Sequence, residues 1–412
     1  MTTVVQEGRM TVETQGFAAR SINKSALDGA FVDAHRRTWA ILRDLSPSQW
    51  QVPYAPGINP PLWEYAHVAW FTEHWVLREP RADEAGHFTA SRPSLLADAD
   101  RWFDSMRVAH PDRWHLDLPP LSRVREYAQA VLDGVRARLA ATDDSDAALY
   151  FFRLALFHED MHAEALIYMR QTLDYPLHAP LAMAPLDPHA NDVAVAGGAF
   201  SIGSSRGEGF VFDNEKWAHP ARGTAGRIDR DCVSNGAFAE FVEAGGYSDP
   251  RWWSDEGRVW LRQAECTGPP RWRESARAGR GHWEQRWFGQ WQPLPLDLPI
   301  CHVNAWEAEA YCRWRGRRLP LEAEWEYAAS QGLIRWGSAV WEWMANAFEP
   351  YPGFSPDPYQ DYSAPWFGTH RSVRGGSFAT DARLRHPRYR NFYLPHRSDV
   401  FIGFRTCGDA TG

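Results

Sequence analysis

Two histidines, His158 and His162, lie four residues apart inside a long apolar segment that has helical periodicity. At this spacing they occupy one face of a helix, about one turn apart. The same face carries a stripe of apolar residues at intervals of three and four, which predicts that it points into the core. Buried imidazoles need a partner, and a metal ion is the partner that best suits such a pair. The alternative is a solvated pair beside Glu159 and Asp160, which the apolar stripe disfavours.

A third metal ligand is expected from a neighbouring helix. His67 and His74 lie seven residues apart, and His67 sits within an apolar stripe with Trp63 and Trp70, so we predict His67 as the ligand. The alternative for His67 alone is a core histidine bonded to a carbonyl group. Three neutral imidazoles suit zinc, Fe(II), copper or nickel, and spacing does not choose among them. Glu164 points away from the face of His162 and is placed to support the site from behind.

The composition excludes several classes of function. The chain has 412 residues, a net charge of −8 and no basic block, so nucleic-acid binding is not expected. No apolar run is long enough for a membrane span, and no secretory segment opens the chain. Five cysteines without CxxC spacing favour a reduced, cytoplasmic protein. No obligate protein partner is inferred, so the expected partners are small molecules.

Helical periodicity dominates the first half of the chain. Residues 1–24 are polar and unpatterned, and we expect them to be disordered. Four long helices are predicted over 28–45, 62–77, about 123–141 after a cap at Ser122, and 147–173, with a shorter one over 95–106. Four long helices with one long crossover predict an all-α four-helix bundle over 25–176.

A different pattern begins after this bundle. Residues 177–192 are rich in proline, alanine, histidine and aspartate and are predicted to be an interdomain linker. Residues 193–412 have short alternating segments and many glycines, which predicts an α+β domain with little regular structure. Ser234 and Asn304 are predicted helix caps, and a further helix is expected over 321–330.

Five stretches of this second half resemble formylglycine-generating-enzyme-type domains, which have a C-type-lectin-like fold. One departure is Leu321, where that family usually has threonine. The five stretches, in order, are 195–203 (VAGGAFSIG), 318–329 (RLPLEAEWEYAA), 340–343 (VWEW), 373–378 (VRGGSF) and 403–405 (GFR).

A DinB-like helical bundle with an HxxxHxE motif before such a domain resembles the ergothioneine-biosynthesis sulfoxide synthase family of mononuclear nonheme iron enzymes. The resemblance implies that His67, His158 and His162 hold Fe(II). It further implies that O₂ is a cosubstrate and that hercynine (Nα-trimethylhistidine) is the substrate. The implied product carries a new carbon–chalcogen bond on the imidazole ring.

Some positions depart from members that use γ-glutamylcysteine. Met161 stands where those enzymes commonly have glutamine. Residues 78–93 correspond to an arginine-rich loop, yet only Ser91-Arg92-Pro93 looks preserved, and Asp83 and Glu84 add negative charge. These differences are similar to the selenoneine synthase branch, whose chalcogen donor is a neutral selenosugar. The alternative is ordinary loop variation in an enzyme that uses cysteine or γ-glutamylcysteine.

The segment 388–397 (RYRNFYLPHR) resembles the C-terminal active-site motif of the family. The resemblance implies a tyrosine as proton donor, with Tyr393 as candidate and Tyr389 in reserve; a buried structural tyrosine is the alternative. The substrate-binding residues it suggests are Met161 for the imidazole, Asn391 and Arg397 for the carboxylate, and Trp343 and Phe392 for the trimethylammonium group. Arg374 and Arg405 belong to fold-defining motifs and are expected to be structural.

Two further functions remain open on the sequence. A metal-dependent thiol transferase would use a related three-histidine bundle, usually without a second domain of this type. A non-catalytic binding module would use the second domain alone, because that fold class includes ligand-binding proteins.

Overall fold

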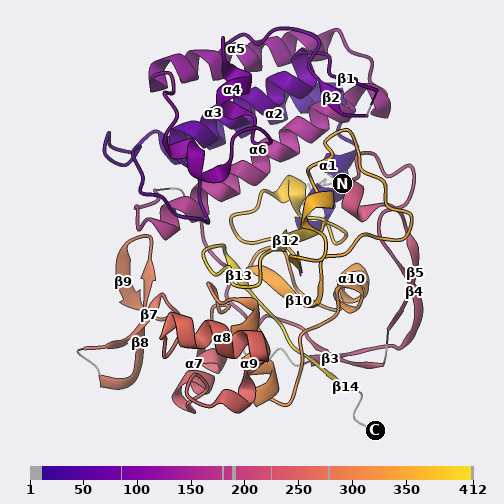
Figure 1. Cartoon of the computed structure of the whole chain (residues 1–412). Helices are drawn as coiled ribbons and strands as arrows, with labels where there is room; N and C mark the ends of the chain where they lie inside the picture. The colour runs from indigo at the N-terminus through magenta and orange to yellow at the C-terminus, as the bar shows by residue number, and fades with distance from the viewer. Residues whose placement is uncertain are drawn as a thin grey trace, which may run out of the picture.

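Helices fill the first half of the chain, whereas the second half combines short strands, short helices and long irregular segments (Figure 1). The structure is a computed structural model that describes residues 12–84, 86–178, 181–187, 192–223, 225–276 and 279–409. The predicted fold class, a helical bundle followed by an α+β domain, is confirmed.

The helical domain is built on four long helices, of which α6 lies nearest the second domain (Figure 1). Asn23 and Ser145 cap the first and last of them, each accepting a hydrogen bond from the backbone three residues on. Ser122 is not a cap, because its helix already begins after Pro120. The four helices are α2 (Lys24–Leu42), α3 (Pro61–Thr72), α5 (Leu121–Ala140) and α6 (Asp146–Thr172).

The connections of the bundle contain short elements. Helix α3 continues directly into a π-helical turn, and the long crossover to α5 passes through a small hairpin and two short helices. These elements are η1 (Glu73–Leu77), β1 (Arg81–Ala82), β2 (Phe88–Thr89), α4 (Ala99–Phe103) and η2 (His110–Trp114).

Helix α1 (Val12–Arg20) lies within the segment that we expected to be disordered, so that prediction was wrong over α1. It packs on the second domain, where the Arg20 guanidinium pairs with the Glu215 carboxylate at 2.7 and 2.8 Å. At Gly16 a Cβ would lie only 1.8 Å from the carbonyl oxygen of Arg385, so the close approach requires glycine. Docking, rather than periodicity, stabilises this helix. Residues 1–11 lie outside the described residues.

The second domain contains several small sheets. In the central sheet, β10 pairs with β11 antiparallel and with β13 parallel, and β11 pairs with β12 antiparallel. The sheets, in strand order, are β12 (Asn391–Tyr393), β11 (Arg371–Arg374), β10 (Trp341–Ala347) and β13 (Ile402–Gly403); β14 (Cys407–Asp409), β6 (Gly226–Asp229) and β3 (Asp192–Val195); β4 (Gly198–Ile202) and β5 (His219–Gly223); and β7 (Trp272–Ser275), β8 (Gly279–Trp287) and β9 (Gln290–Pro293).

Short helices lie between these strands along the chain, and α10 packs on β4, β5 and β11. Ser234 caps α7 as predicted, and Asn304 caps α9 through a capping box with Glu307. The helices and 3₁₀ turns are η3 (Asp213–Glu215), α7 (Asn235–Glu243), η4 (Pro250–Trp252), α8 (Asp255–Ala264), α9 (Ala305–Trp314), α10 (Glu322–Ser330), η5 (Ala364–Trp366) and η6 (Ala382–Leu384).

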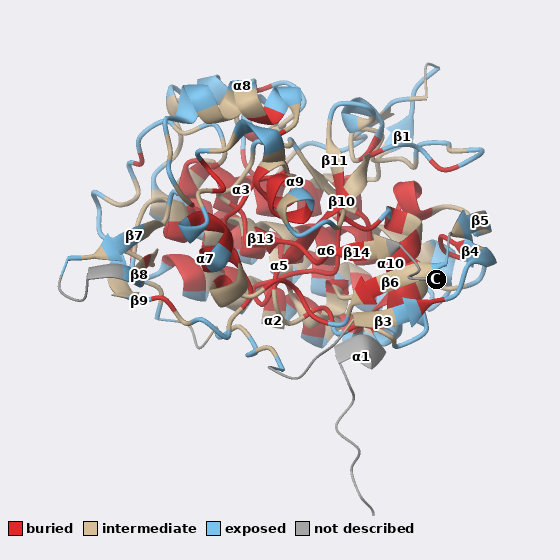
Figure 2. Cartoon of the chain, turned by 90° about the horizontal axis from the view of Figure 1, so that it is seen from below, coloured by how far each residue is buried: buried red, intermediate tan, exposed pale blue. Residues whose placement is uncertain are grey.

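The two domains share one hydrophobic core. A single cluster of buried residues runs from the bundle into the central sheet, and buried segments of α6 and β10 lie together in Figure 2. The fully buried carboxylate of Asp160 on α6 joins the domains by pairing with Arg37 at 2.6 Å and with Arg383 of η6 at 2.8 Å. The predicted linker is irregular over 181–187; its residues 179–180 and 188–191 lie outside the described residues. No helix in the described part of the chain is long and apolar enough to cross a membrane.

Candidate metal centre and active-site cavity

The three predicted histidines come together between α3 and α6. Their candidate ligand atoms all lie within 4.8 Å of one another. The ring centres of His158 and His162 are 4.4 Å apart, and that of His67 is 5.2 and 5.0 Å from them. His74, the alternative to His67, does not belong to this group. The structure therefore supports the choice of His67 on geometric grounds.

Two of the three rings are oriented by hydrogen bonds at Nδ1. Nδ1 of His67 donates to the carbonyl of Phe103 at 2.8 Å. Nδ1 of His162 lies 2.7 Å from Oε1 of Glu64, a buried carboxylate one turn before His67. Because these acceptors hold the proton on Nδ1, they leave the Nε2 lone pair of each ring free for a metal.

The third ring, that of His158, is held by stacking. It lies parallel to the ring of Phe71, with centres 3.5 Å apart, and its Nδ1 has no hydrogen-bond partner among the described residues. Burial lowers the pKa of both His67 and His158 well below the usual value, so both are neutral at pH 7. The three imidazoles, of which His67 and His158 are buried and His162 is half-buried, fit a divalent transition-metal ion such as Fe(II) or Zn(II).

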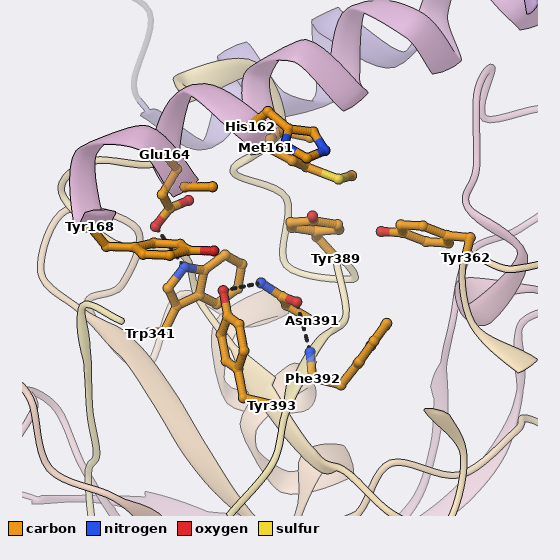
Figure 3. Close-up of a pocket in the computed structure, with 12 residues that line it drawn as sticks. Met161, His162, Glu164, Tyr168, Trp341, Tyr362, Tyr389, Asn391, Phe392 and Tyr393 are labelled. Atoms are coloured by element: carbon orange, nitrogen blue, oxygen red, sulfur yellow. Dashed lines mark hydrogen bonds between the residues drawn. The ribbon is translucent and has the colours of Figure 1, made fainter. Parts of the chain in front are cut away.

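A cavity of about 170 Å³ adjoins this group on the side of His162 (Figure 3). Helix α6 forms one wall, and β10, β12 and neighbouring loops of the second domain form the others. Six of the predicted site residues line it: Met161, His162, Tyr389, Asn391, Phe392 and Tyr393. The remaining lining residues are Glu164, Ala165, Tyr168, Trp341, Tyr362 and Leu384.

Polar contacts fix the walls of this cavity. The Glu164 carboxylate accepts hydrogen bonds from the Trp341 indole at 2.9 Å and from the hydroxyls of Ser377 and Thr380 at 2.5 and 2.6 Å. The Asn391 amide donates to the Tyr393 hydroxyl at 3.2 Å. Burial raises the pKa of the Tyr393 phenol well above its usual value, so Tyr393 stays protonated.

Two predicted substrate contacts lie elsewhere. Trp343 is fully buried in the core, where its indole donates to the carbonyl of Val303 at 2.9 Å, so it does not line the cavity. Arg397 pairs with Asp399 and stands 5.5 Å from the centre of the Tyr393 ring. Arg397 therefore supports Tyr393 from outside the lining. Trp343 thus does not wall the cavity, contrary to the prediction, whereas the contact of Arg397 with a bound carboxylate stays a prediction.

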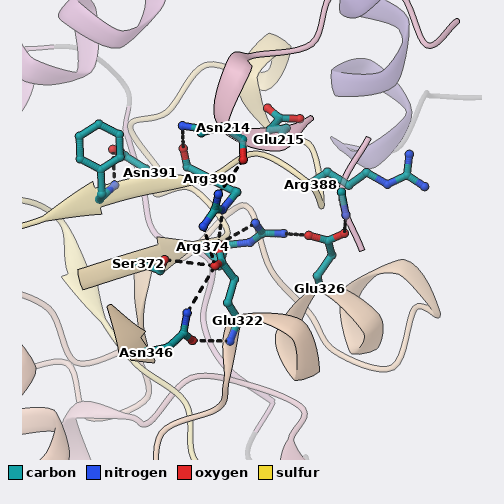
Figure 4. Close-up of polar contacts among 12 residues, drawn as sticks. Asn214, Glu215, Glu322, Glu326, Asn346, Ser372, Arg374, Arg388, Arg390 and Asn391 are labelled. Carbon is teal, nitrogen blue, oxygen red and sulfur yellow. Dashed lines mark hydrogen bonds and ion pairs between the residues drawn. The ribbon is translucent and has the colours of Figure 1, made fainter. Parts of the chain in front are cut away.

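Buried ion pairs anchor the strand that carries Asn391, Phe392 and Tyr393 (Figure 4). Arg390, directly before this strand, pairs with Glu322 at 2.7 Å, and Glu322 also pairs with Arg374 at 3.1 Å. Arg405 similarly pairs with Glu342. Arg374 and Arg405 are thus structural, as expected.

Several site residues were not predicted from the sequence. Glu64 could have been found, because a residue three positions before His67 shares its helical face. Trp341 lies two residues before Trp343, so the alternation along a strand places both on the same face. Only the tertiary contact of Trp341 with Glu164 shows that Trp341, and not Trp343, lines the cavity. Tyr359 approaches His158, with ring centres 6.4 Å apart, from an irregular loop that offered no periodic signal.

Comparisons with known proteins bear on both domains. The family model of the DinB superfamily matches residues 30–169, and that of the sulfatase-modifying factor enzyme 1-like domain matches residues 180–339. A hercynine oxygenase of Mycolicibacterium smegmatis is 31% identical over 86% of this chain and 92% of its own length. A hercynine oxygenase of Mycobacterium tuberculosis is 31% identical over 91% of this chain and 97% of its own length.

A formylglycine-generating enzyme of Streptomyces coelicolor is 29% identical, but the match covers only 56% of this chain. The hercynine oxygenases, in contrast, match across both domains. The chain belongs to the hercynine oxygenase family, the ergothioneine-type sulfoxide synthases.

Proposed function

We propose that this chain is an Fe(II)- and O₂-dependent enzyme that oxidatively joins hercynine to a selenosugar. The observation that carries the proposal is the group of three histidines, two of them buried, beside a cavity lined by aromatic rings and one buried carboxylate. Membership of the hercynine oxygenase family supports the choice of hercynine and O₂.

Fe(II) would be held by His67, His158 and His162. Bound there, the iron would supply open positions for O₂ and for the chalcogen and would carry electrons between them. Glu64 keeps the His162 ring in the orientation that a ligand needs, and Phe71 does the same for His158.

The cavity suits hercynine. The rings of Trp341, Tyr389 and Phe392 can surround a trimethylammonium group, and the buried carboxylate of Glu164 adds a nearby negative charge. The Asn391 amide has a second N–H that can donate to the substrate carboxylate. Met161, next in sequence to His162, places a soft, flexible side chain beside the imidazole of the substrate.

Tyr393 is the candidate proton donor. It is kept protonated by burial, and because Asn391 donates to its oxygen, its own O–H is free to donate. Tyr389 is the reserve candidate; a hydrogen bond joins it to Tyr362, and burial also raises its pKa.

The reaction balances with one O₂ per product. Joining an imidazole C–H to a selenol Se–H removes two protons and two electrons. Since O₂ accepts four electrons, the second pair comes from selenium, which retains one oxygen atom while the other leaves as water. The protein must therefore deliver protons to oxygen within a dry cavity, a task suited to a buried phenol.

The choice of a selenosugar is supported by the pairing of two arginines in the segment 78–93. Arg78 pairs with Asp100 at 2.6 and 2.8 Å, and Arg92 pairs with Glu79, so both are already neutralised, while Arg81 is exposed on β1. A thiol donor with two carboxylates would find few unpaired positive charges in this segment to balance its own negative charges. A thiol donor such as cysteine or γ-glutamylcysteine is the alternative, and the names of the relatives are compatible with it.

A donor competition tests the proposal. Iron-loaded protein receives hercynine with equal amounts of selenosugar, thiosugar, cysteine and γ-glutamylcysteine, in air and under nitrogen, and products are identified by mass spectrometry. We expect O₂-dependent coupling that favours the selenosugar, no coupling with His158→Ala, and normal coupling with the exposed control His115→Ala. Equal product under nitrogen would refute the oxidative reaction, and a preference for γ-glutamylcysteine would refute the donor.

A further inference from the structure

The ring of His67 belongs to a stack that the proposed reaction leaves without a role. Trp63, one turn earlier on α3, lies parallel to it within 8°, with ring centres 4.8 Å apart. The guanidinium of Arg113, from η2, lies over the same indole, with its carbon 4.0 Å from the ring centre. One indole therefore contacts both a candidate metal ligand and a cation.

Hydrogen bonds hold the two rings of this stack in place. Their acceptors are consecutive carbonyls at the C-terminal end of α4. The Trp63 indole donates to the carbonyl of Trp102 at 2.7 Å, and Nδ1 of His67 donates to that of Phe103 at 2.8 Å. Both rings are buried. One backbone segment thus sets the orientation of the ligand ring and of the indole that contacts it.

The charge of Arg113 is not cancelled by a direct ion pair. Its guanidinium donates to two neutral oxygens, Oδ1 of Asn59 at 2.7 Å and the carbonyl of Val108 at 3.4 Å, and its Nε has no partner among the described residues. Arginine keeps its proton in proteins, so the charge stays. Arg397, in contrast, pairs with Asp399. Arg113 is thus a half-buried cation without a carboxylate partner in the described part of the chain.

The charges beside the candidate ligands differ from one ligand to the next. Nδ1 of His162 lies 2.7 Å from the Glu64 carboxylate, which makes that ring a stronger donor to a metal. Burial lowers the pKa of His67 most, and the positive charges of His162 and Arg113 lower it further. A fixed positive charge opposes any increase in the charge of a nearby metal ion, so it disfavours oxidation of that ion.

We infer that Arg113 is a positioning residue that acts through Trp63 on His67, and that its unpaired charge holds iron at this site in the ferrous state; this rests on the proposed Fe(II) site. O₂ reacts with ferrous and not with ferric iron, so an iron that loses its electron between turnovers is inactive. At an effective dielectric constant of about 20, a unit charge about 10 Å from a metal changes a one-electron equilibrium about ten-fold. Salt screens such a half-buried charge less than an exposed one.

The midpoint potential of the iron tests this inference without turnover. Anaerobic, iron-loaded protein is titrated with redox mediators, and Fe(III) is followed by electron paramagnetic resonance. Arg113→Gln removes the charge but keeps an N–H donor for Asn59, and Arg113→Met removes it but keeps an apolar chain over Trp63. Arg113→Lys keeps the charge. Circular dichroism establishes which variants are folded, and one folded neutral variant is enough for the test.

Arg125→Gln is the matched control. Arg125 also lies over a tryptophan of the helical domain, with its guanidinium carbon 4.2 Å from the ring centre of Trp39. The ring of Trp39 contacts Tyr65, with centres 5.7 Å apart, and Tyr65 is not one of the candidate ligands. This variant should therefore have the wild-type potential.

We expect the neutral variants of Arg113 to shift the ratio of Fe(III) to Fe(II) at a fixed potential about ten-fold toward Fe(III), which is a midpoint potential about 59 mV lower. Arg113→Lys should keep most of the wild-type potential. Fe(II) affinity, measured with a competing chelator, should be unchanged or higher in the neutral variants, because a repelling charge is gone. A purely structural contact would instead lower the affinity when it is lost.

An unchanged potential in a folded neutral variant would overturn the inference, as would an equal fall in Arg113→Lys or in Arg125→Gln. Lower Fe(II) affinity in the neutral variants would show that Arg113 is structural. A wild type that binds no Fe(II) would refute both the inference and the proposed function. If the potential shifts as expected but no donor is coupled to hercynine in air, the proposed reaction fails while the role of Arg113 stands.

Discussion

Glu64 is expected to control metal affinity without touching the metal. Its carboxylate is 1% exposed and lies 2.7 Å from Nδ1 of His162. Removing a partner that orients a ligand histidine typically costs about 10–100-fold in metal affinity, or about 1.4–2.7 kcal/mol. Glu64→Gln retains an acceptor oxygen but loses the charge, so we expect about a 10-fold loss; Glu64→Ala leaves Nδ1 without its acceptor, so we expect about 100-fold.

The affinity is measured by anaerobic titration of Fe(II) against a competing chelator. Glu73→Gln is the matched control, because Glu73 is also a buried acid in the same helical run but accepts from Ser94 and Tyr127 rather than from a histidine ligand. Its variant should be destabilised yet bind Fe(II) as the wild type does. A folded Glu64→Ala protein with wild-type affinity would refute the role of Glu64, as would an equal loss in Glu73→Gln.

Three further predictions address the cavity and the fold. Tyr393→Phe should slow O₂ consumption in single-turnover assays by about 100-fold or more, with hercynine affinity unchanged, whereas Tyr389→Phe should have a much smaller effect. Burial opposes ionisation of Glu322, but its arginine partners lower its pKa to about 2. The stabilisation from its charge is therefore fully present above pH 4.5 and is lost as the pH falls toward 2. Urea unfolding should show that the free energy of unfolding falls by about 3 kcal/mol across that range, and Glu322→Gln should lack this part of the decline. Asp160→Asn leaves Arg37 and Arg383 without their shared buried partner and should lower the free energy of unfolding by about 3–5 kcal/mol in the same assay.

The group of three histidines was predictable because its signal is local. The spacing of His158 and His162 and the apolar stripe around His67 identify one face of each helix, and two such faces in a bundle must meet. The central sheet was harder to assign. Trp341 and Trp343 alternate identically along β10, and the distinction between a cavity wall and a core residue depends on the position of α6 above that strand.

A cavity of about 330 Å³, lined by Phe71, His74, Asp104 and Asp361 among others, could not be predicted from the sequence. The π-helical segment that contains His74 has an ordinary helical composition. Its wider turn is visible only in the hydrogen bonds, such as that from the Arg78 N–H to the Glu73 carbonyl at 3.1 Å, which spans five residues. Asp104 and Asp361 come from different domains and meet only after docking. The acidic residues Asp83 and Glu84 pointed to a change in donor charge, but they do not line the cavity.

Helix α6 joins metal binding to domain docking. It carries two of the candidate ligands, His158 and His162, and two acids that bind the second domain, Asp160 and Glu164. Each acid lies two residues after a histidine, so the acids occupy a different face of the same turns. Because the histidines and the acids lie on one continuous helix, the contacts of the acids with the second domain also position the histidines relative to the strand that carries Tyr393. The cavity can therefore keep its width only while both domains stay docked, which explains why buried charges, costly in themselves, stand at this interface.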